Sequence, residues 1–142
     1  MKTMNIANII EKRDCGKLRI CFSTNWKYPL KRLLSGFGLY PNETLLEEVS
    51  ELQAREIVET LLWKDLAYNG EIMPREDAKK YAAYFFSSVV PAGGRFYTNA
   101  LWQNYHGTSS FGFNPFTSST FDGGVLIVEK NLAISFWVED ED

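Results

Sequence analysis

The alternation of apolar and polar residues predicts both helices and strands near the start of this chain. From Lys17 to Trp26, polar residues alternate with Leu18, Ile20 and Phe22. This period of two is typical of a strand with one buried face. Before it, isoleucines at helical spacing predict a short helix over Thr3–Arg13.

The middle of the chain has helical periodicity throughout. Pro29 can start a short helix that runs to Leu34. The run Glu43–Ala67 turns its apolar face part-way along, and Ser50-Glu-Leu-Gln53 has the form of a capping box, so we predict two helices with a bend at Ser50 and an end at Asn69-Gly70. Another helix is predicted to begin at Pro74. Its buried stripe would comprise Ala78, Tyr81, Ala82, Phe85 and Val89.

The last third of the chain is rich in β-branched and aromatic residues. Phe96–Trp102 and Ser110–Phe113 are candidate short strands, whereas Gly124–Glu129 and Leu132–Val138 predict a clear β-hairpin. The hairpin is nearly all apolar, so we expect both of its faces to be covered. We predict a single α+β domain over residues 1–142, with about four helices, mainly in the N-terminal two-thirds, packed on an antiparallel sheet that the hairpin completes.

The charge is unevenly distributed. Up to Arg32 the balance is +6, and from Leu33 onward it is −9, which gives a net charge of −3 over 142 residues. Binding to a phosphate backbone requires clustered positive charge, so the acidic bulk of the chain argues against nucleic acid as the partner. An acidic surface fits a basic protein partner better.

Few residues are suited to metal binding or catalysis. The two cysteines, Cys15 and Cys21, cannot form a disulfide framework or a four-ligand zinc site, and His106 is the single histidine. We expect no metal and no cofactor. No apolar run approaches the roughly 18 residues that a membrane span needs, and the N-terminus does not resemble a signal peptide, so we expect a cytoplasmic protein without membrane contact.

Two acidic groups are candidates for partner binding. The first lies on the predicted helices around Ser50 and comprises Glu47, Glu48, Glu51 and Glu59. The second is the C-terminal run Glu139, Asp140, Glu141 and Asp142. Each has a simpler interpretation, a solvated helix face for the first and a frayed tail for the second. Each could instead dock a basic partner, the tail as an anionic plug that is tethered to the sheet.

Other side chains leave two alternatives open. Asp122 before Gly123-Gly124 is most simply a tight turn, but together with His106 and a nearby hydroxyl it could serve a small hydrolase or transferase. The aromatics of Phe96–Phe116, which include Trp102 and Tyr105, could form core, anchor a protein interface or stack the bases of a single-stranded nucleic acid or another ligand.

The C-terminal stretch TFDGGVLIVEKNLAISFWVEDED and the acidic segment Glu47–Glu59 carry a resemblance in kind. The chain resembles the immunity proteins of bacterial polymorphic toxins, including those of contact-dependent growth-inhibition systems. This resemblance implies a non-enzymatic protein that binds one cognate toxin, often a nuclease with a basic active site, and occludes it. The two acidic groups would supply the contacts, with Trp102 or Tyr105 as anchors; the partner's identity and the oligomeric state stay open.

Overall fold

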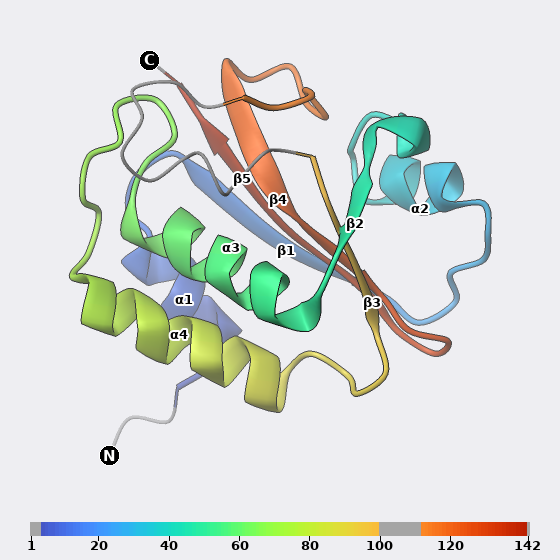
Figure 1. Ribbon diagram of the computed structural model, residues 1–142, viewed down its shortest axis with the longest axis horizontal. Helices are drawn as coiled ribbons and strands as arrows, with labels where there is room; N and C mark the ends of the chain where they lie inside the picture. Colours follow the sequence, from blue (N-terminus) through green and yellow to red (C-terminus); the bar gives the residue numbers. More distant parts are fainter. Residues whose placement is uncertain (1–3, 100–111, 142) are drawn as a thin grey trace.

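The computed structural model describes residues 4–99 and 112–141. Within these residues the chain forms α-helices, β-strands and one short 3-10 helix (Figure 1). In chain order they are α1 (Ile6–Lys12), β1 (Lys17–Ser23), α2 (Leu30–Gly36), the 3-10 helix η1 (Glu43–Leu45), β2 (Glu47–Val49), α3 (Glu51–Trp63), α4 (Arg75–Ser88), β3 (Arg95–Thr98), β4 (Phe121–Val128) and β5 (Ala133–Asp140). None of the described helices is long and apolar enough to cross a membrane.

The strands form one antiparallel sheet in the order β1-β5-β4-β3-β2. The predicted hairpin β4–β5 lies within the sheet, and β1 pairs with β5 from Lys17↔Glu139 to Ser23↔Ala133. The N-terminal strand thus lies beside the C-terminal one, and β1 and β2 form the two edges. The predicted α+β fold, with helices on an antiparallel sheet completed by the hairpin, is confirmed.

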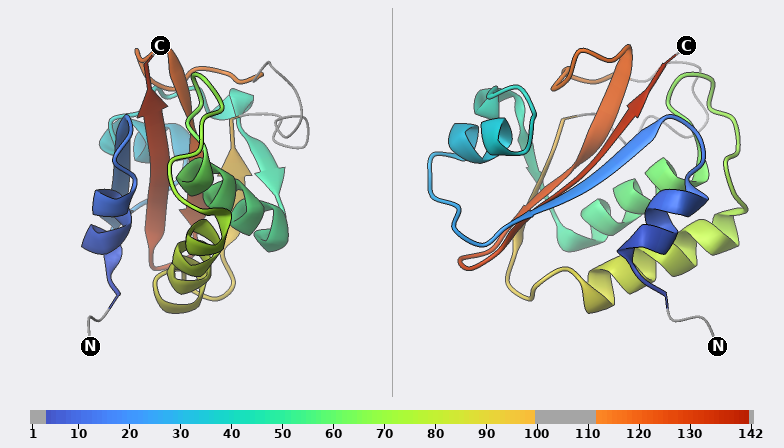
Figure 2. Two further views of the ribbon diagram at one scale, coloured as in Figure 1. Left: turned by 90° about the vertical axis from the view of Figure 1, so that its left-hand side faces the viewer. Right: turned by 180° about the vertical axis from the view of Figure 1, so that it is seen from behind.

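Helices cover both faces of the sheet. Figures 1 and 2 show α1, α3 and α4 on one face and α2 on the other. Val125 and Phe136 pack with α3 and α4 in one buried cluster, while Leu126 and Trp137 pack with α2 and Phe116 in a second. The hairpin is therefore buried on both sides, as its nearly all-apolar sequence predicts.

Local signals predict the starts of the two long helices well. The Ser50 hydroxyl accepts a hydrogen bond from the Gln53 backbone N–H at 3.1 Å, and the Gln53 side chain accepts one from the Ser50 N–H at 2.9 Å. This capping box begins α3, as predicted. Pro74 is the residue before α4, and the predicted stripe residues Ala78, Ala82 and Phe85 are buried.

The prediction of a helix between residue 43 and Ser50 is wrong. Glu43–Leu45 is a single 3-10 turn, and Glu47–Val49 is strand β2, which pairs with β3 through Val49↔Phe96. Pairing with a strand that follows almost 50 residues later overrides the local helical periodicity. The next helix also ends earlier than predicted, at Trp63, because the Asp65 side chain accepts hydrogen bonds from the backbone N–H groups of Tyr68 and Gly70 and closes a turn there.

Two of the predicted strands, β1 and β3, end earlier than predicted. β1 ends at Ser23 rather than Trp26, and Phe22 is 44% exposed although it alternates in phase with the buried Leu18. β3 ends at Thr98, inside the predicted Phe96–Trp102 strand. Ser110 and Phe111, half of the predicted strand Ser110–Phe113, lie outside the described residues.

Candidate protein-binding surface

Edge strand β2 carries two of the predicted contact residues. Glu47 and Glu48 are both exposed. On its inner side β2 pairs with β3, and within residues 4–99 and 112–141 no strand pairs with its outer side. An edge strand offers backbone N–H and C=O groups to a partner, so these glutamates stand where another protein can approach.

Glu48 forms an ion pair with Arg95, whereas Glu47 forms none with a described Lys or Arg. The Arg95 guanidinium donates two hydrogen bonds to the Glu48 carboxylate, at 2.7 and 2.9 Å. The hydrogen bond from Arg95 lowers the pKa of Glu48 below its ordinary value. No Lys or Arg of the described residues lies within ion-pair distance of Glu47. Glu47 is therefore an uncompensated charge at this edge, and Glu48 is partly neutralised.

The first turn of α3 adds a carboxylate and an exposed leucine. Glu51 is exposed at the first helical position, where the positive end of the helix dipole favours a negative charge. Leu52 is 66% exposed, and Leu45, just before β2, is 41% exposed. We call Leu45, Glu47, Glu51 and Leu52 the β2–α3 surface; Figure 1 shows β2 leading directly into α3. It combines uncompensated negative charge with exposed apolar area.

Glu59 does not belong to this surface. Its side chain is only 12% exposed, and one carboxylate oxygen lies 3.7 Å from the guanidinium of Arg75. The same guanidinium stacks over the Trp63 ring, 4.7 Å from the ring centre. Glu59 is thus held in a contact between α3 and α4, because its position in the helix points it toward the neighbouring helix.

Asp140, in the predicted C-terminal acidic run, belongs to the sheet rather than to a free tail. Residues 133–140 are strand β5, and Asp140 is 1% exposed. Its carboxylate accepts hydrogen bonds from Arg13 at 2.8 and 3.0 Å and from the Leu66 backbone N–H at 2.8 Å. The interpretation of this run as frayed is therefore wrong for Asp140, which has no surface left for a partner.

Glu139 and Glu141 lie at the end of the same strand but differ in exposure. Glu139 is half-buried; it accepts a hydrogen bond from the Ser119 hydroxyl at 2.9 Å and lies 3.3 Å from Arg19. Glu141 is exposed, and hydrogen bonds from Thr120 lower its pKa. Among Glu139, Asp140 and Glu141, the predicted C-terminal contacts that the structure describes, Glu141 alone has its carboxylate in solvent. Asp142, Trp102 and Tyr105 lie outside the described residues.

Asp122 is a structural carboxylate rather than a turn residue. It lies in β4 and is 0% exposed. Its oxygens accept hydrogen bonds from five donors, which are the Phe116 and Thr117 backbone N–H groups, the Thr117 hydroxyl, the Asn99 amide and the Trp137 indole. Burial raises the pKa of this carboxyl above its ordinary value.

This environment argues against the alternative of an enzyme that uses Asp122. A general base must reach the proton that it abstracts, and here every approach to the carboxylate is occupied by the chain's own donors. His106 lies outside the described residues. Among the residues described, no three His, Cys, Asp or Glu side chains are grouped to hold a metal ion.

Sequence reasoning missed three features of this site. It did not anticipate that Leu45 and Leu52 are exposed, or that Arg95 pairs with Glu48. It also left the basic N-terminal segment without a role, although residues 21–37 line a cavity. The positive balance up to Arg32 was the available signal for that cavity.

Comparison with known proteins assigns no family to this geometry. No protein-family model, curated protein or solved structure matched the chain. We therefore infer a function from the side chains of this chain alone.

Proposed function

We propose that this protein is a non-enzymatic binding module, an immunity protein that acts in the bacterial cytoplasm. It binds one cognate protein toxin with a basic active site, such as a nuclease, and neutralises it by occluding that site. Complementary charge would direct the encounter, and apolar contacts would hold the complex.

The observation that carries the proposal is the β2–α3 surface. Within eight consecutive residues it presents two exposed carboxylates without an ion-pair partner and two exposed leucines. Glu51 suits the positive end of the α3 dipole, whereas Glu47 lies in an edge strand without an ion-pair partner among the described residues, and this unpaired charge favours a role in binding. Exposed leucines beside them supply apolar area that a partner could bury.

The two kinds of side chain would act on different rates. Carboxylates at the rim of an interface accelerate association with a basic partner, and they do so most at low salt. Buried apolar contacts mainly slow dissociation. Glu48 would exchange its bond with Arg95 for one with a toxin cation, and Glu141 could add a further contact at the C-terminal end of β5.

Capture and rescue together test the proposal. Tagged protein would be used to capture binding proteins from the native host, and each captured basic protein would then be expressed in a sensitive strain with and without this chain. The variant Glu47→Lys/Glu51→Lys changes the β2–α3 surface. The control Glu11→Lys/Asp14→Lys makes the same charge change at exposed positions in α1 and after it, near the opposite sheet edge.

We expect to capture one protein that stops growth unless the wild-type chain or the control variant is also expressed. The surface variant should protect poorly. Full protection by the surface variant would refute the placement of the binding surface. Failure of every captured protein to inhibit growth would refute the immunity function itself.

A further inference from the structure

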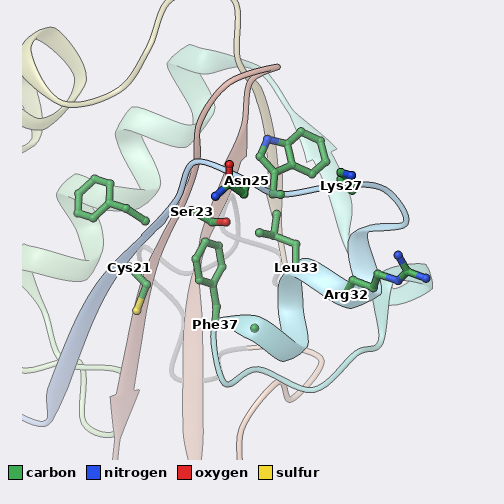
Figure 3. Close-up of a pocket in the computed structure, with 10 residues that line it drawn as sticks. Cys21, Ser23, Asn25, Lys27, Arg32, Leu33 and Phe37 are labelled. Carbon is green, nitrogen blue, oxygen red and sulfur yellow. The ribbon is translucent and has the colours of Figure 1, made fainter.

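A cavity opens on the other side of the molecule from α3 and α4. It lies between the end of β1, the loop after it and helix α2, and has a volume of about 470 Å³ (Figure 3). Small-molecule sites typically span roughly 300–1,000 Å³, so this cavity is large enough for a compact organic ligand. It is separate from the β2–α3 surface, whose residues do not line it.

The apolar side of the cavity is held firmly in place. Leu33 and Phe37 are 5% and 6% exposed and belong to the core cluster on this face of the sheet. The half-buried Trp26 indole donates a hydrogen bond to the backbone carbonyl of Glu129 at 2.7 Å. Cys21 and Ser23 come from β1, which is fixed by its pairing with β5. A ligand would therefore meet a wall that is already formed.

The polar side of the cavity is cationic. Lys27 and Arg32 line it, both are exposed, and neither forms an ion pair with another described residue. No aspartate or glutamate is among the lining residues. Asn25 and Ser23 add hydrogen-bonding groups. Two of the eight basic residues up to Arg32 thus line this cavity, beside the apolar side chains of Trp26, Leu33 and Phe37.

We propose that this cavity binds a small organic anion, a molecule with a flat apolar body and one carboxylate or phosphate group. The body would lie against Trp26, Leu33 and Phe37, and the anionic group would be held by Lys27 and Arg32. Charge-assisted hydrogen bonds from these two cations would select the anion over a neutral analogue. This site goes beyond the proposed function, because it uses different residues and the opposite charge.

The test measures, by NMR, the chemical shifts of the backbone amides and of the Trp26 indole N–H during titration with three probes. These are 1-naphthoate, 1-naphthyl phosphate and the neutral 1-naphthamide, so that carboxylate and phosphate are distinguished from each other and from the apolar body. The variant Lys27→Gln/Arg32→Gln removes both cations. The matched control, Lys79→Gln/Lys80→Gln, removes two exposed lysines from α4, on the other face of the sheet.

We expect saturable shifts at Cys21–Ser23, Asn25 and the Trp26 indole with at least one anion. Lys27→Gln/Arg32→Gln should weaken binding of the anion at least about fivefold. The control variant should bind the anion as wild type does, and the affinity of the neutral probe should be the same for all variants. Equal binding of 1-naphthamide and the anions, shifts located elsewhere, or no saturation at millimolar probe would each overturn the proposal. Growth protection plays no part in this readout, so it stands or fails independently of the immunity function.

Discussion

At the residue scale, the buried Arg13–Asp140 pair ties three parts of the chain together. Arg13 is the C-cap residue after α1, and Asp140 is the last residue of β5. The pair also bonds to the carbonyl of Leu61 and the N–H of Leu66 around the end of α3. Both side chains are at most 2% exposed. A buried charge left without its partner is costly, so each member depends on the other.

Replacing Asp140 should therefore be severe. Asp140→Ala leaves the Arg13 guanidinium buried and uncompensated, and we expect a loss of about 3–5 kcal/mol in the free energy of unfolding. Urea denaturation would measure it. The exposed neighbour supplies the comparison, since Glu141→Ala should change stability by less than about 0.5 kcal/mol. Similar stability of the two variants would contradict the assignment of Asp140 to the core.

The buried Asp122 carboxyl should make the stability of the fold depend on pH. Burial raises the pKa of its carboxyl in the folded protein above the ordinary value of 3.8. Folding then favours the protonated form, so the stabilising contribution is complete below about pH 3.8 and is lost as the pH rises through the folded pKa. Asp122→Asn has no such titration. The free energy of unfolding of wild type minus that of this variant, measured by urea denaturation from pH 3 to 7, should fall as pH rises. A rise with pH would contradict the direction of the pKa shift.

At the element scale, the central hairpin depends on close contact between β4 and β5. Gly124 pairs with Trp137, and a Cβ at Gly124 would meet the Trp137 ring at 2.5 Å and the Phe136 carbonyl. The Trp137 indole also bonds to Asp122, at 3.1 Å. Gly124 thus provides the space in which the largest fully buried side chain lies.

Gly124→Ala should displace that indole. We expect a loss of about 1–3 kcal/mol in unfolding free energy from overpacking, together with a changed near-ultraviolet circular dichroism spectrum. Gly36→Ala is the control, because a Cβ at Gly36 meets nothing within 4 Å. An unchanged aromatic spectrum in Gly124→Ala would show that the sheet accommodates the methyl group without moving Trp137.

Two leucines on opposite faces of helix α3 lead to a prediction about stability. Leu61 is fully buried, whereas Leu52 is 66% exposed in the first turn. Leu61→Ala should lower the free energy of unfolding by about 2–5 kcal/mol, and Leu52→Ala by less than about 0.5 kcal/mol. Thermal and urea unfolding would compare them. A large loss from Leu52→Ala would mean that this leucine is covered.

The elements that sequence predicts correctly are those whose cause is local. The Ser50 capping box and the apolar hairpin β4–β5 are determined by residues close together in the chain. Strand β2 is not, because its pairing partner β3 lies almost 50 residues away. Asp122 illustrates the same limit: Asp-Gly-Gly is typical of a turn, and its actual role depends on donors from Asn99 to Trp137.

At the scale of the whole molecule, the basic and acidic segments of the sequence lie at opposite edges of the sheet. The basic N-terminal segment supplies edge strand β1 and the cations of the cavity beside α2. The acidic β2–α3 surface lies at the opposite edge of the sheet. A positively charged protein would therefore be attracted toward the β2 edge and repelled from the β1 edge, which orients it before contact.

Binding through the β2–α3 surface is tested most directly by the affinity of a captured and purified toxin for three forms of this chain. Surface plasmon resonance would compare wild type, Glu47→Lys/Glu51→Lys and the control Glu11→Lys/Asp14→Lys over a range of salt concentrations. We expect at least about tenfold weaker binding by the surface variant, mainly through slower association, with a reduced salt dependence. The control should bind like wild type or nearly so. Equal weakening by the two variants, or none by the surface variant, would contradict binding through the β2–α3 surface.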